Sequence, residues 1–537
     1  MADFGALNWA ILVAYVVSNL LLGALLSKRV TTANDFYLGR RTTPWWAIGI
    51  SVIATYVSAL SFLGGPAWSY RESLAVLAIH LNYPIVVFVV ITVFLPFFFN
   101  SGVASIYDYM EQRFGPTSRA VIAGVFLISQ TLSSAAILYA TALVIEFITG
   151  VDVTTCIVIV TIVALIYTMM GGITAVIWTD VIQAGVLFVG AFIIMFALID
   201  QLPAPLADVL AQLKAQGKTN ALDLSADLSR EATVWSGIIA MSIFHITVYG
   251  ANQMMVQRTL AAKNIGDAKK SFLLMGFVAF FIYFLFFVLG ILLYSYYGGR
   301  AFDNDNTIIL TFASDYGLPG LMGLIAAAIV AASMSTLDSS FNSLSTISTI
   351  DFYQKYVRKD ASPEHYLNVT RAFTVFWAAL IIVPAILYAS LEGSVLQTLS
   401  KIGSYFVGAK LSMYGLGFFS RQTTEKGLLV GVAAGFVMIW FLATQTDIAW
   451  PWYCLFGGGV NIVVSIAASL LLDGRQHEWS EFTIKGQQRM FKEKGLPEKD
   501  GNWYVVPGRV DSVSYLLLVF FVATLIFLYA FHTFIGA

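Results

Sequence analysis

Long apolar segments recur along almost the whole chain, and they limit the folds that it can adopt. About fourteen of them are long enough to cross a bilayer as a helix, which takes roughly 20 residues. Hydrophobic residues make up 58% of the 537 residues and charged residues 11%, which excludes an ordinary soluble domain. The segments are also too long for the short alternating strands of a membrane β-barrel. We therefore predict a polytopic, all-α membrane protein with spans near 8–27, 45–70, 78–99, 120–147, 153–170, 176–199, 234–256, 272–297, 318–347, 367–390, 398–419, 426–444, 450–472 and 513–535.

Basic residues are distributed unevenly between the loops that join these spans. Loops rich in Lys and Arg, such as the one with Arg258 and Lys263 and the long segment 473–512, alternate with loops that carry few. Because cytoplasmic loops are enriched in Lys and Arg, we expect the basic set inside and both termini on the outer side of a bacterial inner (plasma) membrane. The net charge of -1 says nothing about nucleic acid, and no basic arm suggests a nucleic-acid partner. The lipid bilayer is an expected partner, and no obligate protein partner is implied.

The ninth apolar segment contains the hydrophilic run S-M-S-T-L-D-S-S-F-N-S. One face of this helix, at helical spacing, contains Ser335, Ser339, Asn342 and Ser343, and Thr336 and Asp338 flank it. Closely spaced oxygens are what a small hard cation binds after it loses water. The alternative is that the hydroxyls bond to their own helix or join it to a neighbour, which we favour for the hydroxyls taken alone. A carboxylate at membrane depth is expensive and usually functional, so Asp338 favours a cation site.

Two further spans carry signs of interruption. The span 45–70 has small and hydroxylic residues followed by Gly64-Gly65-Pro66, and the span 234–256 has Gly250 in a polar run. A helix broken inside the membrane frees backbone carbonyls that coordinate cations. These spans lie five apart and begin two sets of five, 45–199 and 234–419. An odd number of helices per set gives the sets opposite orientations, which is typical of inverted-repeat transporters.

The chain is then a single transporter domain, 1–537. An extra N-terminal helix at 8–27 precedes the two sets, and three C-terminal helices at 426–537 follow them and contain the cytoplasmic loop 473–512. No nucleotide-binding or catalytic motif is visible, so we predict that the protein is not an enzyme and that any uphill transport uses an ion gradient. Lys410 lies at membrane depth, where an ammonium needs a carboxylate, carbonyls or an anionic ligand.

Three motifs resemble the sodium:solute symporter family. They are G-G-x-x-A-V-x-W-T-D-x-x-Q at Gly171–Gln183, N-Q-x-x-x-Q-R-T-L-A-A-K at Asn252–Lys263, and the hydroxyl-rich helix that ends in T-I-D-F-Y at Thr349–Tyr353. Together with the span pattern, the resemblance extends over nearly the whole chain. It implies a leucine-transporter-like core of two inverted five-helix repeats, alternating access, and Na⁺ as the coupling ion.

The resemblance also implies site residues. A sodium ion between the second and ninth spans would be held by Ala54, Val57, Ala332, Ser335 and Thr336. Some members have a second sodium site, which here would use Asp180, Asp338 and Ser339. Asp338 stands where a serine is common, which leaves the ion stoichiometry open. An alternative for Asp180 is a place at the cytoplasmic interface.

The substrate residues of members that bind a sugar match this sequence poorly, and Lys410 or a protonated histidine could replace the arginine of the sialic-acid members. The candidates are Ser61, His80, His245, Tyr249, Asn252, Ser400 and Lys410. Galactose itself is not expected, because Ser61, His80 and His245 stand where those members have glutamine, glutamate and asparagine. We favour a sugar or an acidic sugar derivative as the small-molecule substrate. A sodium-coupled monocarboxylate or polyol symporter, or a proton-coupled carrier of the same fold, is the alternative.

Overall fold

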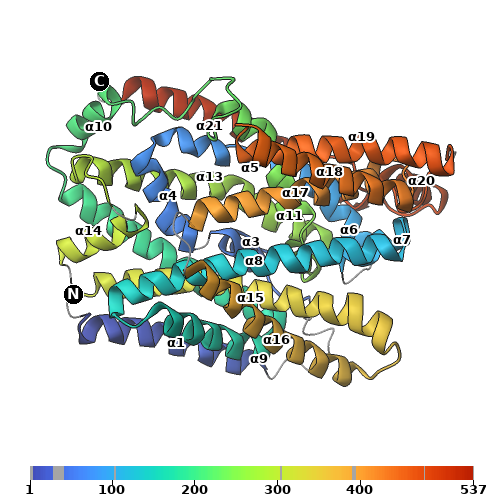
Figure 1. Cartoon of the computed structure of the whole chain (residues 1–537), viewed down its shortest axis with the longest axis horizontal. Helices are drawn as coiled ribbons and strands as arrows, with labels where there is room; N and C mark the ends of the chain where they lie inside the picture. Colours follow the sequence, from blue (N-terminus) through green and yellow to red (C-terminus); the bar gives the residue numbers. More distant parts are fainter. Residues whose placement is uncertain are drawn as a thin grey trace.

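The protein is a bundle of helices, most of which run along one long axis (Figure 1). The computed structural model describes residues 4–27, 41–57, 59–101, 105–302, 305–317, 319–389, 395–476 and 478–535. Strand structure in these residues is confined to one antiparallel hairpin, β1 (Lys499–Asp500) paired with β2 (Trp503–Tyr504). The prediction of a helical membrane protein is confirmed.

The helices fall into three groups along the chain. The first group is α1 (Ala6–Ser27), α3 (Trp45–Tyr56), α4 (Ala59–Arg71), η1 (Leu74–His80), α5 (Tyr83–Val89), η2 (Val90–Phe94), α6 (Leu95–Ser101), α7 (Ile106–Arg113), α8 (Pro116–Thr149) and α9 (Val153–Asp200). The second is α10 (Leu206–Ala215), η3 (Ser236–Ala240), α11 (Met241–Gly250), α12 (Gln253–Leu260), α13 (Ile265–Tyr296), η4 (Asp305–Thr307), α14 (Ile308–Tyr316), α15 (Leu321–Ile347), η5 (Ser348–Val357), α16 (Pro363–Ala389) and α17 (Val395–Phe419). The third is α18 (Glu425–Gln445), η6 (Trp450–Trp452), α19 (Tyr453–Asp473), α20 (Ile484–Glu493), η7 (Ser512–Ser514) and α21 (Tyr515–Phe534).

Within the described part of the chain, 9 helical segments are long and apolar enough to cross a membrane. They are Leu74–Asn100, Pro116–Thr149, Ile173–Asp200, Ile265–Tyr296, Leu321–Val357, Pro363–Tyr388, Glu425–Gln445, Trp450–Asp473 and Ser512–Phe534. Shorter apolar helices lie at Ala6–Ser18, Trp45–Thr55, Val153–Ile166 and Ser236–Gly250. The total of about fourteen spans stays a prediction.

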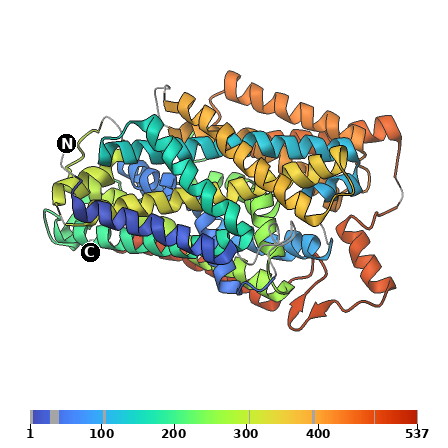
Figure 2. The ribbon, with the colours of Figure 1, turned by 90° about the horizontal axis from the view of Figure 1, so that it is seen from below.

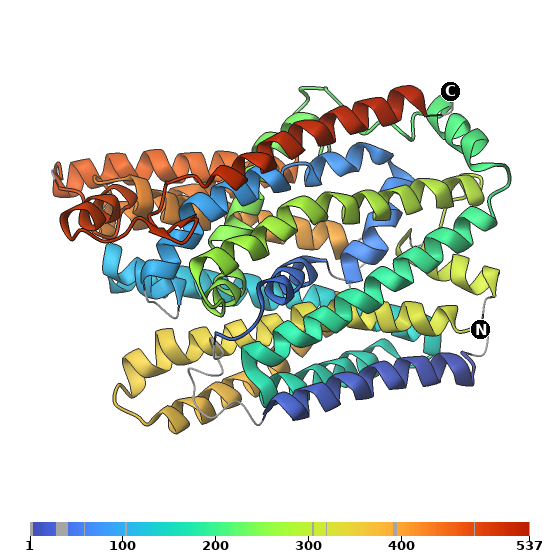
Figure 3. The same cartoon turned by 180° about the vertical axis from the view of Figure 1, so that it is seen from behind.

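Helix α9 contains two of the predicted spans, 153–170 and 176–199. A straight helix of its 48 residues would be about 72 Å long, more than twice the thickness of a bilayer core. Figures 1 and 3 show α9 bent back on itself, so that its two ends lie at the same end of the bundle. The two legs therefore behave as separate antiparallel spans, as the hydropathy pattern predicts.

The span 45–70 is broken, but not where the glycines and proline suggested. The α-helix α3 ends at Tyr56, and its C-cap Val57 has φ −81° and ψ 81°, whereas α4 continues through Gly64-Gly65-Pro66. The interpretation of that triplet as the break was wrong, because α4 passes through it without interruption. A Cβ added to Gly290 of α13 would lie 2.2 Å from the carbonyl oxygen of Pro66, so the two helices touch through their backbones.

The second break also lies in the span that was expected to be interrupted. Helix α11 ends at Gly250, and Asn252 has an extended backbone (φ −126°, ψ 131°) before α12 begins at Gln253. The Asn252 side chain accepts a hydrogen bond of 2.9 Å from the backbone N–H of Met254, which caps the new helix. The first helix of each predicted set of five is therefore discontinuous.

The segment 478–511, which we call the docked loop, packs on the end of the bundle opposite the start of α1 and the end of α21 (Figure 2). Lys269 of α13 forms a buried ion pair of 2.5 Å with Asp511 of this loop. Tyr109 of α7 donates a hydrogen bond to the carbonyl of Phe482. The loop is thus fixed to two helices of the bundle, and it lies on the side that the basic residues predict to be cytoplasmic.

Candidate functional site

The break between α3 and α4 lies against α15. The Thr336 hydroxyl donates a hydrogen bond of 3.0 Å to the carbonyl of Thr55, in the last turn of α3. Ala54, Val57 and Thr336 are all buried, each with 5% of its surface exposed. The last turn of a helix has carbonyls without helical partners, so this junction gathers backbone and hydroxyl oxygens. Ala332 and Ser335 also belong to α15, but their side chains lie outside the described part.

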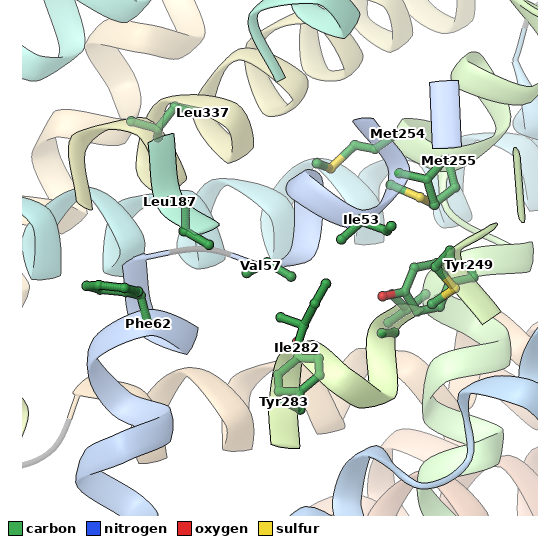
Figure 4. Close-up of a cluster of buried hydrophobic side chains, with 14 of the residues drawn as sticks. Ile53, Val57, Phe62, Leu187, Tyr249, Met254, Met255, Ile282, Tyr283 and Leu337 are labelled. Atoms are coloured by element: carbon green, nitrogen blue, oxygen red, sulfur yellow. The ribbon is translucent and has the colours of Figure 1, made fainter. Parts of the chain in front are cut away.

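The surroundings of the break are dry and well packed. Figure 4 shows Val57 within a cluster of buried apolar side chains that also contains Ile53, Phe62, Leu187 and Leu337. Such walls exclude water, which strengthens any interaction between an ion and the oxygens at the break.

Several polar residues of α15 join it to neighbouring helices. The amide of Gln257 in α12 donates to the Asn342 side-chain oxygen at 3.1 Å and accepts from the Ser343 hydroxyl at 2.7 Å. Ser340 accepts a hydrogen bond of 2.9 Å from Gln130 of α8. For Asn342, Ser343 and Ser340 the structure therefore bears out the helix-joining alternative.

Arg258 of α12 is fully buried where α3, α9 and α15 meet. It forms an ion pair of 2.9 Å with Asp180 of α9, and it donates to the hydroxyl of Ser51 at 2.7 Å and to that of Ser339. Ser51 in turn donates to Asp180. The placement of Arg258 in a loop was therefore wrong, because it belongs to the buried helix α12, which follows the Asn252 break. Asp180 is fully buried by protein, with none of its surface exposed.

Asp338 of α15 also faces α9. Its two carboxylate oxygens lie 3.3 Å from the Thr168 hydroxyl and 3.5 Å from the Thr179 hydroxyl. These threonines belong to the two legs of α9. Of the three residues implied as a second sodium site, Asp180 and Ser339 contact the Arg258 guanidinium, and Asp338 contacts the two threonines.

A cavity of about 160 Å³ opens beside the first turn of α4. Its walls are formed by Ser61, Gly65, Trp68, Ile79, His80, Met241, Phe244, His245, Tyr283, Phe287 and Trp450. Three substrate candidates from separate parts of the sequence, Ser61, His80 and His245, therefore line one space. No Lys, Arg, Asp or Glu is among these lining residues.

The hydrogen bonds of Asn82 determine which nitrogen of the His245 ring carries a hydrogen. The Asn82 amide nitrogen donates to the carbonyls of Ile79 and Gly237, both at 2.9 Å, so its side-chain oxygen is the acceptor that faces His245. His245 Nδ1 lies 2.7 Å from Asn82 and must carry the hydrogen. In the neutral ring Nε2 is then a hydrogen-bond acceptor, on the edge away from Asn82.

His80 is held by aromatic rings. It stacks on Tyr283, with ring centroids 3.5 Å apart and an interplanar angle of 9°. Its Nδ1 lies 3.0 Å from the phenol oxygen of Tyr83. The Tyr283 ring and the two imidazoles thus form a polar edge in an otherwise aromatic cavity.

Tyr249, Asn252 and Lys410 are not among the residues that line this cavity. The ring of Tyr249 lies 5.8 Å from that of Tyr83, and Tyr83 in turn stacks on His245 of the cavity wall. Asn252 is the cap of α12. Lys410 of α17 donates to the Ser129 hydroxyl of α8 at 2.8 Å and lies 5.4 Å from the centre of the Phe126 ring. The side chain of Ser400 lies outside the described residues.

The comparisons with known proteins agree with this arrangement. The family model described as "Sodium:solute symporter family" matches residues 36–435. The sodium/sialic acid symporter of Proteus mirabilis is 27% identical over 88% of this chain and 97% of its own length. The sodium/glucose cotransporter of Vibrio parahaemolyticus is 30% identical over 76% of this chain and 79% of its own length.

A solved structure of a substrate-bound, outward-open Na⁺-coupled sialic acid symporter superposes with a TM-score of 0.82. It is 27% identical and covers 89% of this chain and 100% of that chain. The family model spans well over half of the sequence, and the structural likeness extends to nearly the whole bundle. The chain therefore belongs to the sodium:solute symporter family and is a membrane-embedded, sodium-coupled symporter rather than an enzyme.

Proposed function

We propose that the protein carries a sugar or an acidic sugar derivative together with Na⁺, by alternating access. The observation that carries this proposal is the aromatic cavity lined by Ser61, His80 and His245, directly after the break where α3 meets α15. Binding sites for small organic molecules combine apolar and aromatic walls with a few placed polar groups, which is the composition found here.

Sodium would bind at the break itself. Its ligands are the carbonyls of Ala54, Val57 and Ala332 and the hydroxyls of Ser335 and Thr336. Carbonyl and hydroxyl oxygens suit a hard cation, and the hydrogen bond from Thr336 to Thr55 supports the approach of the two segments. Since Ser61 lies four residues after Val57, in the first turn of α4, an ion that orders the break also orders one wall of the cavity.

The solute would be recognised mainly through hydroxyl groups. Neutral His245 offers the Nε2 lone pair, which accepts a hydrogen bond from a hydroxyl but repels a carboxylate. The flat faces of Trp68 and Tyr283 suit the apolar face of a sugar ring. A polyol presents the same hydroxyls and is the alternative solute. An acidic sugar would place its carboxylate away from His245.

Alternating access would follow from two inverted repeats, 45–199 and 234–419, each beginning with a discontinuous helix. The helix 8–27 and the helices of 426–537 would flank this core, with both termini outside. The Arg258 cluster supports a closed cytoplasmic path, because it ties α12 to α3, α9 and α15. For the solute to leave, α12 would have to release these partners.

The test is uptake into proteoliposomes. Neutral hexoses, sialic-type acidic sugars, polyols and short monocarboxylates are each supplied with an inward Na⁺ gradient, with K⁺ in place of Na⁺, and with a pH gradient at zero Na⁺. We expect a sugar to accumulate only with Na⁺, and His245→Ala to abolish uptake while Na⁺ binding persists. Accumulation driven by the pH gradient alone, or of monocarboxylates alone, would refute the proposal.

A further inference from the structure

One wall of the aromatic cavity comes from outside the two predicted repeats. The other lining residues that the structure describes belong to α4, η1, α11 and α13. Trp450 begins η6, the short turn between α18 and α19 in the third group of helices. The family model matches the chain up to residue 435, so Trp450 is a wall that the family match does not cover.

The backbone around Trp450 is anchored on both sides. Directly before it, the N–H of Ala449 donates a hydrogen bond of 2.9 Å to the carbonyl of Leu228, in the segment between α10 and η3. After it, in α19, the thiol of Cys454 donates to the carbonyl of Ala240 at 3.2 Å. Neither contact uses the indole, so a substitution of Trp450 keeps both of them.

The indole itself packs on two other walls of the cavity. Its ring meets that of Phe244 in α11 edge to face, with centroids 6.1 Å apart and an interplanar angle of 73°. The same buried cluster contains Ile79 of η1 and Met241 of α11. Edge-to-face aromatic pairs are favourable beyond the area that they bury, so this packing fixes the position of the Trp450 ring.

The volume of the cavity limits the solute to one ring. The cavity measures about 160 Å³, and an apolar cavity of about 150 Å³ holds one benzene molecule. A disaccharide has a second ring, which needs space that a side chain of the wall now fills. The cavity therefore has room for one sugar ring and not for two.

Trp450 is a wall that can change without disturbing the helix breaks. Ser61 lies in the first turn of α4, next to the first break, and His245 lies in α11, which ends at the second break. A change of either residue acts on a break as well as on the cavity. Trp450 belongs to neither of these helices, so its size can alter the cavity alone.

We propose that Trp450 determines which solutes fit, by limiting the cavity to sugars with a single ring. This inference rests on the proposed function and narrows its substrate class to monosaccharides and their acidic derivatives. The indole closes the cavity toward η6, and a shorter side chain there admits a second ring.

The experiment measures the size selectivity of uptake into proteoliposomes with an inward Na⁺ gradient. The probes are D-glucose and D-mannose, each with the disaccharide of two such units, maltose and mannobiose. In Trp450→Ala we expect the ratio of disaccharide to hexose uptake to rise at least about tenfold, because the wall that excludes the second ring is gone. We also expect a higher KM for the hexose and an unchanged Na⁺ requirement. Trp450→Phe keeps an aromatic wall and should shift the ratio in the same direction by less.

Trp452 provides the matched control. It is a buried indole on the same turn that is not among the residues that line the cavity, so Trp452→Phe should leave the ratio unchanged. If Trp450→Ala does not fold, Trp450→Phe decides. An unchanged ratio in the folded Trp450 variants, with hexose uptake still dependent on Na⁺, would overturn the role of Trp450 and leave symport intact. A wild type that accumulates none of these sugars with Na⁺ would instead overturn the proposed sugar symport.

Discussion

Removal of either partner of the buried Arg258–Asp180 pair should destabilise the protein strongly. The side chains have 1% and 0% of their surface exposed, and Arg258 has further acceptors in Ser51, Ser339 and the carbonyl of Met254. Asp180→Asn leaves the buried Arg258 guanidinium without this counter-charge. Arg258→Met leaves the buried Asp180 carboxylate without the guanidinium. Breaking such a pair costs about 3–5 kcal/mol, so each single variant should lose that much free energy of unfolding.

The double variant Asp180→Asn/Arg258→Met provides the sharper measurement. The double variant contains neither buried charge. We therefore expect its loss of free energy of unfolding to be smaller than the sum of the two single losses by about 3 kcal/mol. The free energies are measured by denaturant titration in mixed micelles. The exposed pair Arg489–Glu493 is the control, and Glu493→Gln should leave the stability unchanged. If the loss of free energy in the double variant equals the sum of the two single losses to within about 0.5 kcal/mol, the two side chains do not interact as the structure indicates.

Three further results are expected. Lys269→Met should release the docked loop, because Asp511 loses its 2.5 Å partner, and limited proteolysis should cleave that loop faster than in the wild type. Gly290→Ala should destabilise the fold by about 1–3 kcal/mol or more, since its Cβ would lie 2.2 Å from the Pro66 carbonyl oxygen, and thermal unfolding measures this. Na⁺ at about 100 times its Kd should raise the free energy of unfolding by about 2.7 kcal/mol, whereas K⁺ should not.

The helix breaks and the polar face of α15 are visible in the sequence because they depend on local chemistry. A hydroxyl-rich run in an apolar segment and a polar run around Gly250 can both be recognised from the local sequence, without knowledge of the residues that they contact. Family resemblance then placed the first break near Ala54 and Val57, where α3 does end. The triplet Gly64-Gly65-Pro66 does not break the span, because α4 runs through it, and the close contact with α13 there depends on Gly290.

Arg258 was misplaced for a different reason. Its neighbours in the sequence are polar, as in a loop, and its counter-charge Asp180 lies 78 residues away. The signal that could have found it is the spacing of Gln253, Gln257 and Arg258 on one short helix, each with a buried partner. The proton position on His245 was equally hidden, because it depends on how Asn82 is oriented by two backbone carbonyls.

The central claim is that a sodium ion lies where the end of α3 meets α15, and one measurement tests it most directly. The Na⁺ concentration for half-maximal solute uptake is determined in proteoliposomes for the wild type, Thr336→Val and the control Thr161→Val, since the Thr161 hydroxyl donates to the carbonyl of Ile157 in its own helix. We expect Thr336→Val to need at least tenfold more Na⁺, with Thr161→Val unchanged. An unaltered Na⁺ requirement in Thr336→Val would contradict the placement of the ion.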